Sequence, residues 1–257
     1  MTKDQRIFKD LIRFLHKKGS ASEFPGQLVL EIGKLFLGTP YVAGTLETKG
    51  TEHLVVNLRE YDCSTFVENV VALAWYVKSR KKSFDAFHRL LRKIRYRQGR
   101  LRGYSSRLHY FSDWIYDNQK KGIVMDVTAE IGGRPLKKAL TFMTAHPDHY
   151  PPLRNGANLR RMRSVEKTIS KRSHFFIPNK ALRHLEERIR VGDIIAITAN
   201  AEDIDVLHVG LAVRVKNRIH LLHASSREGE VVLSKETLYR YLMQNRARSG
   251  IIVARLP

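Results

Sequence analysis

The sequence predicts an α+β fold in which helices pack on an antiparallel sheet. Segments with helical periodicity come first in the chain, and apolar strand-like segments joined by short connections fill the last third. Neighbouring strands with short connections pair antiparallel, so the last third should form a meander. The length of 257 residues and the hydrophobic share of 43% suit one domain with a substantial core, which we expect to span residues 1–257.

The expected helices share apolar side chains at helical spacing. The second of them should end at Gly38-Thr39-Pro40, which is a stop signal. In chain order they cover residues 4–18, Pro25 to Phe36, Cys63 to about Val77, Phe84 to Tyr96, Tyr110 to Asn118 and Thr237 to Asn245.

The expected strands are apolar runs rich in β-branched residues. Lys216-Asn217 forms the turn between two of them, and prolines and a glycine between residues 142 and 158 predict a segment that wraps the surface. In chain order the strands cover His53 to Leu58, Ile123 to Ile131, Gly192 to Thr198, Leu207 to Val215, Arg218 to Ser226 and Gly250 to Leu256.

Cys63 is the only cysteine, so it cannot form a disulfide within the chain. It lies where small polar residues give way to a long apolar run, which predicts a helix start at or beside it. The positive end of the helix dipole should lower the thiol pKa and favour a nucleophilic thiolate. A buried thiol that only packs is the alternative interpretation.

Two histidines in the strand-like segments can complete a site with this thiol. Alternate side chains of a strand share a face, so His220 and His223 point to opposite faces and cannot both reach Cys63. A thiol hydrolase needs one imidazole that takes the thiol proton and a third polar group that orients this imidazole. Cys63, His208 and His223 can fill these roles. An ordinary half-buried strand histidine is the alternative interpretation of His223.

Several motifs in this order resemble the NlpC/P60 cysteine hydrolases. The resemblance implies a papain-like α+β fold in which Cys63, His208 and His223 are catalytic. Gly38-Thr39-Pro40-Tyr41-Val42-Ala43-Gly44 resembles the Pro-Tyr-x-x-Gly segment of that family, which implies that Tyr41 helps to form the site beside the cysteine. The other motifs are Tyr61-Asp62-Cys63-Ser64-Thr65-Phe66-Val67, Gly192-Asp193-Ile194, His208-Val209-Gly210-Leu211 and His223-Ala224-Ser225.

The long segment between the cysteine and the first of these histidines resembles the DUF1460 subfamily, which is regarded as N-acetylmuramoyl-L-alanine amidase-like. The resemblance implies an insertion of helices and loops over about residues 80–185. Its segment Ser106 to Trp114 is the part associated with the subfamily, and it implies substrate-binding roles for Arg107, Tyr110, Ser112 and Asp113. Aromatic rings can stack on sugar faces, and a guanidinium can bind a carboxylate. Core packing is the alternative interpretation of the aromatic residues.

The resemblance therefore implies a cysteine amidase that cleaves the bond between N-acetylmuramic acid and L-alanine in peptidoglycan fragments, with a preference for anhydro-ended sugars. Such an enzyme needs no metal or cofactor. His146-Pro147-Asp148-His149 has metal-binding residue types, but its proline and loop context argue against a metal site. Two alternatives stay open: an endopeptidase that cuts the stem peptide after D-glutamate, and a basic, non-catalytic protein that binds an anionic polymer.

The chain is strongly basic, with 46 Lys and Arg against 25 Asp and Glu and a net charge of +21. Between Lys78 and Arg107 there are twelve basic residues and one acid, Asp85. Such a segment is either a solvated surface or a docking surface for an anionic partner. We expect peptidoglycan fragments as the partner and no specific nucleic acid.

No stretch approaches the ~20 apolar residues that span a bilayer. The first residues also lack the apolar stretch of a secretory signal. The resemblance implies a periplasmic or otherwise exported protein, whereas the residues themselves leave a cytoplasmic location open.

Overall fold

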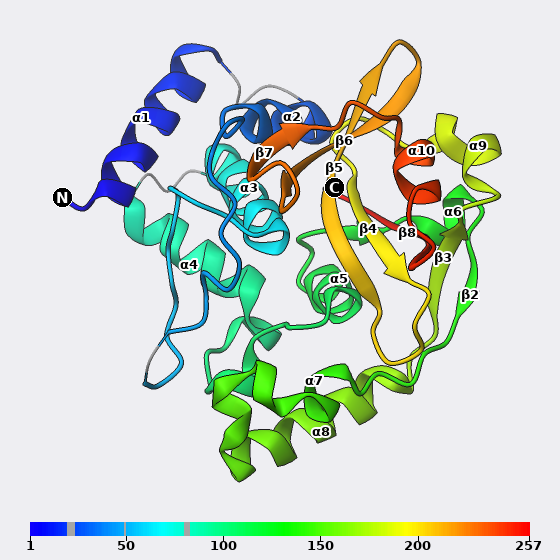
Figure 1. The fold of residues 1–257 in the computed structure, drawn as a ribbon. Helices are drawn as coiled ribbons and strands as arrows, with labels where there is room; N and C mark the ends of the chain where they lie inside the picture. Colours follow the sequence, from blue (N-terminus) through cyan, green and yellow to red (C-terminus); the bar gives the residue numbers. More distant parts are fainter. Residues whose placement is uncertain (20–23, 49, 80–82) are drawn as a thin grey trace.

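An antiparallel sheet of eight strands forms the centre of the molecule as far as its residues are described (Figure 1). The computed structural model describes residues 1–19, 24–48, 50–79 and 83–257. The strand order is β2-β3-β8-β4-β5-β6-β7, and β1 also pairs with β8. The strands are β1 (Met125–Asp126), β2 (Arg134–Leu136), β3 (His174–Pro178), β4 (Ile194–Ala199), β5 (Val206–Val215), β6 (Arg218–Ser225), β7 (Glu230–Leu233) and β8 (Arg248–Arg255).

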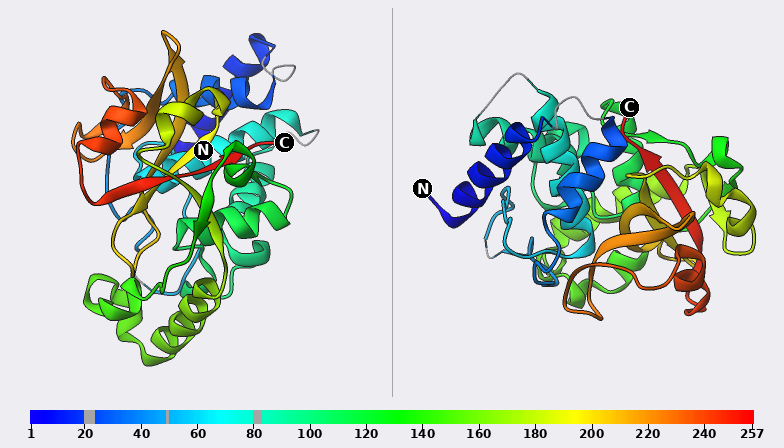
Figure 2. Two further views of the ribbon diagram at one scale, coloured as in Figure 1. Left: turned by 90° about the vertical axis from the view of Figure 1, so that its right-hand side faces the viewer. Right: turned by 90° about the horizontal axis from the view of Figure 1, so that it is seen from above.

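Helices cover both faces of the sheet (Figure 2). One face packs against α1 (Lys3–Lys17), α2 (Pro25–Lys34), α3 (Cys63–Lys78), α4 (Phe84–Arg95) and α5 (Phe111–Lys120). The other face packs against α6 (Thr128–Ile131), α9 (Leu182–Leu185) and α10 (Leu238–Met243). The period of two in β5 separates the two cores, because Val209 and Leu211 face the first group of helices and Ala212 faces the second. These layers confirm the predicted α+β fold.

A smaller third core includes side chains of α7 (Phe142–Ala145) and α8 (Gly156–Ser170), which lie at the bottom of the view in Figure 1. Its members include Tyr110, Met143 and Met162. The proline-rich stretch that the sequence places on the surface forms α7, two short 3₁₀ turns and the start of α8. No helix among the described residues is long and apolar enough to cross a membrane.

The expected helices and the four strands expected after residue 190 are present, with ends that differ by one or two residues. The strand expected over His53 to Leu58 is wrong. Its carbonyls are satisfied by side chains instead of a neighbouring strand: the Tyr96 hydroxyl donates to His53 O at 3.0 Å, and Arg95 donates to Val55 O. The backbone there is extended but has no ladder partner among the described residues.

The strand expected over Ile123 to Ile131 is also largely wrong, because only β1 forms and α6 follows at once. The Asp126 carboxylate accepts hydrogen bonds from the Thr128 N–H at 3.0 Å and from its hydroxyl at 2.6 Å. These bonds turn the chain into a helix. The segment 80–185 is not made of helices and loops alone, since its strands β1 and β3 both pair with β8.

The basic segment between Lys78 and Arg107 divides into two kinds of cation. Arg95 is buried and donates to Glu68 at 2.6 Å, and Arg97 and Arg107 also have carboxylate partners. Arg80, Lys81 and Lys82 lie outside the described residues. The exposed cations are Lys78, Arg89, Arg92, Lys93, Arg100 and Arg102.

Candidate active site

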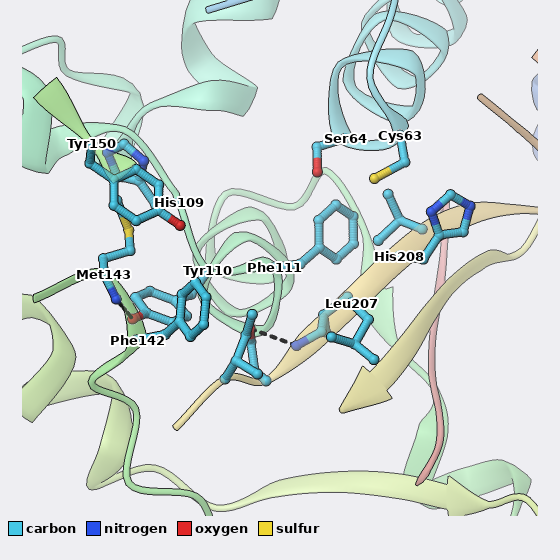
Figure 3. Close-up of a pocket in the computed structure, with 14 residues that line it drawn as sticks. Cys63, Ser64, His109, Tyr110, Phe111, Phe142, Met143, Tyr150, Leu207 and His208 are labelled. Carbon is cyan, nitrogen blue, oxygen red and sulfur yellow. Dashed lines mark hydrogen bonds between the residues drawn. The ribbon is translucent and has the colours of Figure 1, made fainter. Parts of the chain in front are cut away.

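Cys63 is the first residue of α3, as the sequence predicts. Asp62 caps the helix: its carboxylate accepts from the Thr65 N–H at 2.7 Å, and its own N–H donates to the Thr65 hydroxyl at 2.9 Å. This capping box fixes the direction in which α3 leaves the preceding loop. The thiol is half-buried and faces the start of β5 (Figure 3).

The expectation that the helix start lowers the thiol pKa is wrong. Burial, followed by the negative charge of Asp62, raises the pKa of Cys63 to about 11. Hydrogen bonds from the Val209 backbone and from Ser64 act in the opposite direction, but they do not outweigh the loss of water around the sulfur. Cys63 is therefore a neutral thiol in the resting protein.

The two histidines predicted for the site contact each other. His208 lies on β5 and His223 on β6, and His208 Nε2 is 2.6 Å from His223 Nδ1. Gly210 makes room for this contact, because a Cβ atom there would lie 2.9 Å from the Cβ of His223. His220 points elsewhere and contacts Ser234 O through Nδ1 at 2.9 Å, which agrees with the expected alternation along the strand.

Both histidines are neutral at ordinary pH. Burial, then the neighbouring His223 and the positive charge of Arg248, lower the pKa of His208 to about 3. Burial, followed by the charge of Arg248, lowers the pKa of His223 to about 4. The ring of Tyr241 in α10 lies edge-on to His223 with the centroids 5.5 Å apart. The Arg248 guanidinium lies over the Tyr241 ring, with its central carbon 3.9 Å from the ring centroid. Tyr241 therefore helps to hold the histidine pair.

Cys63 and His208 line one hollow of about 140 Å³ (Figure 3). Tyr110 belongs to its wall, as the resemblance implies, but its hydroxyl is engaged elsewhere and donates to Glu166 at 2.8 Å. The hydroxyl of Tyr110 is thus already occupied within the fold. The remaining wall is formed by Ser64, His109, Phe111, Phe142, Met143, Tyr150, Ile204, Asp205, Val206, Leu207 and Val209.

Sequence reasoning missed three polar residues of this wall. His109 and Tyr150 come from the segment between Cys63 and His208. Asp205 lies three residues before His208 in the sequence. Asp205 accepts a hydrogen bond from the Ser112 N–H at 2.7 Å, and this caps the first turn of α5. An acid close before a site histidine is the sequence signal that could have found Asp205. Burial raises its pKa.

Three residues with implied substrate-binding roles lie outside the wall of the hollow. Ser112 is buried and contributes its backbone N–H to the contact with Asp205. Asp113 is buried and binds two arginines of this chain, Arg97 and Arg172. Arg107, the third residue, binds Glu47 and Glu52 of this chain.

The Arg107 guanidinium donates to Glu52 through Nε at 3.0 Å and through Nη2 at 2.8 Å, and to Glu47 through Nη1 at 2.8 Å. It also stacks on the Tyr104 ring at 4.9 Å. The side chain is buried, so its partners are satisfied within the fold. In the structure Arg107 ties Glu47 and Glu52 to the segment before α5.

Tyr41 lies beside the cysteine, as the resemblance implies. Its N–H donates to Gly229 O at 2.7 Å, and a parallel bridge joins it to Tyr61. Burial raises the pKa of the Tyr41 hydroxyl, and the nearby negative charges of ionised Cys63 and Asp62 raise it further. A neutral hydroxyl close to the sulfur can donate a hydrogen bond.

No group of three or more His, Cys, Asp and Glu side chains in the described part of the chain could hold a metal ion. His146 and His149 stack with their centroids 5.6 Å apart. The Nδ1 atom of His146 contacts the Phe142 carbonyl at 2.9 Å.

A comparison with protein families matches residues 31–251 to the AmiA-like family, described as N-acetylmuramoyl-L-alanine amidase-like. The chain belongs to this family. A comparison with curated proteins finds no match. The match to the AmiA-like family confirms the resemblance that the motifs predict.

Solved structures are also similar to this AmiA-like chain. An N-acetylmuramoyl-L-alanine amidase from Bacteroides uniformis is 39% identical, with a TM-score of 0.86, over 91% of this chain and 99% of that one. A protein from Bacteroides fragilis described as a putative xylanase is 40% identical, with a TM-score of 0.82, over 88% and 99%. A DUF1460 protein from Legionella pneumophila is 23% identical, with a TM-score of 0.73, over 97% and 94%, and shows the shared fold.

Proposed function

We propose that this AmiA-like chain is a cysteine amidase that hydrolyses the bond between the lactyl group of N-acetylmuramic acid and L-alanine in peptidoglycan fragments. One observation carries the proposal: the thiol of Cys63 shares a hollow with His208, whose far nitrogen is 2.6 Å from His223. A nucleophile, a base and a group that orients the base are the parts that a thiol hydrolase needs. The family to which the chain belongs supplies the substrate class.

The histidine contact sets the protonation states that the reaction uses. His208 contacts His223 through Nε2, so its Nδ1 is the nitrogen that remains for the thiol. If Nδ1 is to accept a proton, the Nε2 of His208 must carry the hydrogen and His223 Nδ1 must accept it. His223 thereby fixes the tautomer of His208 and stabilises the imidazolium that forms in the reaction.

The reaction starts from neutral partners. Since the pKa of Cys63 is about 11 and that of His208 about 3, an ion pair is not formed in advance. His208 Nδ1 takes the thiol proton as the sulfur attacks the amide carbon. The same imidazolium then protonates the departing nitrogen of L-alanine, and water hydrolyses the thioester with His208 again as base.

The negative charge that develops on the carbonyl oxygen has two proposed partners. The backbone N–H of Cys63 lies at the start of α3, where helix N–H groups have no partner within the helix. The hydroxyl of Tyr41 is the second donor. Such donors lower the barrier because they are already in place when the charge appears.

The wall of the hollow suits a sugar-peptide ligand. The rings of Tyr110, Phe111 and Tyr150 offer apolar faces, and His109 offers a polar edge. The net charge of +21 attracts fragments that carry the carboxylates of the stem peptide. A preference for anhydro-ended sugars, suggested by the resemblance, is part of the proposal.

The proposal includes a papain-like NlpC/P60 arrangement in one domain, with residues 80–185 as its insertion. The support is the position of Cys63 at a helix start and of His208 and His223 on neighbouring strands. We also propose that the protein acts in the periplasm or another exported location, where such fragments arise. Cell fractionation with an antibody against the chain tests this location.

Mass-spectrometric digestion of defined substrates tests the function. The substrates are a muropeptide with an intact sugar, its anhydro-ended counterpart and the free stem peptide. We expect wild-type protein to release a stem peptide that begins with L-alanine from the first two, faster from the anhydro form. Cys63→Ala should release none.

The other results separate the alternatives. Cuts within the free stem peptide by the wild type would replace the amidase with an endopeptidase that cuts after D-glutamate. No cleavage of any substrate, together with salt-dependent binding of an anionic polymer, would replace it with a binding protein.

A further inference from the structure

A second hollow, of about 380 Å³, lies beside the C-terminal half of α5 and has no part in the proposed reaction. Phe111 of α5 lines the cysteine hollow, whereas Tyr116 of the same helix lines this one. Five residues along a helix correspond to a turn of roughly 140°, so the two hollows open on different sides of α5. The second hollow is lined by Arg97, Gln98, Tyr116, Asp117, Lys120, Lys121 and Arg172.

Positive charge in this hollow exceeds the negative charge that the chain supplies. Arg97 donates to Asp113 at 2.6 Å, and Arg172 donates to the other oxygen of the same carboxylate. One carboxylate balances only one of the two guanidinium groups. Lys121 uses Asp117 at 2.6 Å, and Lys120 has no carboxylate partner among the described residues.

The guanidinium of Arg172 keeps unused donors at the hollow. Only its Nη1 atom has a hydrogen-bond partner in the described part of the chain, and its side chain is 19% exposed. An oxyanion is the partner that a guanidinium binds best.

The walls of the hollow are held in place. The guanidinium of Arg172 stacks on the Tyr116 ring at 3.8 Å, which fixes its plane. Gln98 has a left-handed backbone with φ of 54°, and its N–H donates to both oxygens of Asp117 at 3.1 Å. Conformations that non-glycine residues rarely adopt are concentrated at binding sites.

We propose that this hollow binds a phosphate group, with Arg172 and Lys120 as donors and Arg97 as a neighbouring positive charge. A phosphate dianion matches the two cations that lack a carboxylate of their own, and its oxygens match the guanidinium fork. The site is independent of the amidase reaction, so its test needs no substrate turnover.

Isothermal titration calorimetry with inorganic phosphate, at an ionic strength held constant with sodium chloride, tests the site. We compare wild type with Lys120→Glu and with Lys9→Glu, which makes the same charge change on an exposed lysine of α1. Wild type should bind one phosphate saturably, Lys120→Glu at least about tenfold more weakly, and Lys9→Glu like wild type. Arg172→Lys keeps the charge but loses the fork, and it should also weaken binding.

Thermal unfolding of each variant without phosphate verifies that it folds, and Lys120→Glu, at an exposed position, is the variant on which the test depends. Equal affinity in Lys120→Glu and Lys9→Glu, or no saturable binding to wild type, would overturn the proposal. Acetate in place of phosphate is the second arm. If acetate binds as tightly as phosphate, the hollow takes carboxylates and the assignment to phosphate is wrong.

Discussion

His208 Nε2 and His223 Nδ1 are 2.6 Å apart, so a single hydrogen lies between the two rings and determines the tautomer of both. The contact depends on the antiparallel pairing of β5 with β6 and on the missing side chain of Gly210. It leaves His208 Nδ1 as the only ring nitrogen of that residue that can serve as a base.

Replacement of His223 should therefore impair catalysis without removing the base itself. We expect His223→Leu to lower kcat by roughly 10²-fold or more. His223→Asn should lose less, because an amide oxygen can still accept from His208 Nε2. Initial rates of muropeptide hydrolysis measure both. His220→Leu, on the opposite face of β6, is the matched control and should keep a near wild-type kcat.

The single cysteine makes the thiol pKa directly measurable. Since burial raises the pKa of Cys63 to about 11, the rate of its alkylation by iodoacetamide should rise with pH up to about that value. The unfolded chain should instead level off near an ordinary thiol pKa of about 8.5. A plateau of the folded protein already below pH 7 would indicate a preformed thiolate and contradict the neutral resting pair.

Buried neutral histidines should make stability depend on pH. In the fold the pKa values of His109, His208 and His223 are about 3, 3 and 4. An unfolded histidine has a pKa of about 6.5. Between these values the unfolded chain binds more protons, so the free energy of unfolding falls as the pH falls below about 6.5, by up to ~1.4 kcal/mol per pH unit for each histidine.

Urea unfolding at pH 7 and pH 5 measures this slope. His109→Gln removes one of the three groups, so its slope should be shallower than that of wild type. An unchanged slope in this variant would mean that His109 does not contribute.

Gly210 tests how tightly the histidine pair is packed. In Gly210→Ala the new Cβ would lie 2.8 Å from Leu221 and 2.9 Å from His223. We expect a loss of about 1–3 kcal/mol in the free energy of unfolding and a lower kcat, because His223 must shift. The control is Gly156→Ala at the start of α8, where the nearest atom is the mobile end of Arg160 at 3.4 Å; it should match wild type in both measurements.

Arg107 allows a structural role to be separated from ligand binding. If its contacts with Glu47 and Glu52 are its function, Arg107→Met should cost about 3 kcal/mol of stability, because it leaves the buried carboxylate of Glu52 without its guanidinium. KM of the folded variant should then change little. A large rise in KM with stability intact would instead support the implied contact with a ligand carboxylate.

Local sequence signals predicted the elements that carry the proposed catalytic groups. The cap at Asp62, the long apolar run after Cys63 and the alternation around His208 and His223 are all contained in short stretches of chain. The short strands β2 and β3 were not predicted. Their pairing partners are distant in sequence, as Arg134 with Phe176 and Ile177 with Ile251 show.

The ion-pair partners of charged side chains could not be predicted from local sequence either, because they are distant in the chain. From the sequence, Arg107 is expected to bind a substrate carboxylate. In the structure its guanidinium binds Glu47 and Glu52, which lie more than fifty residues earlier in the chain. The pKa of Cys63 was misjudged for the same reason. The helix start is visible in the sequence, whereas the burial that raises the thiol pKa arises only in the folded chain.

The position of β8 has a consequence for biosynthesis. Its residues 248–255 lie in the interior of the sheet, paired with β1, β3 and β4, yet they leave the ribosome after every other strand. Until then β3 and β4 have no common neighbour, and Arg248 cannot stack on Tyr241 behind the histidine pair. Cys63 is therefore synthesised well before the strand that completes the sheet behind the histidine pair, and the proposed hydrolysis can begin only once β8 is in place.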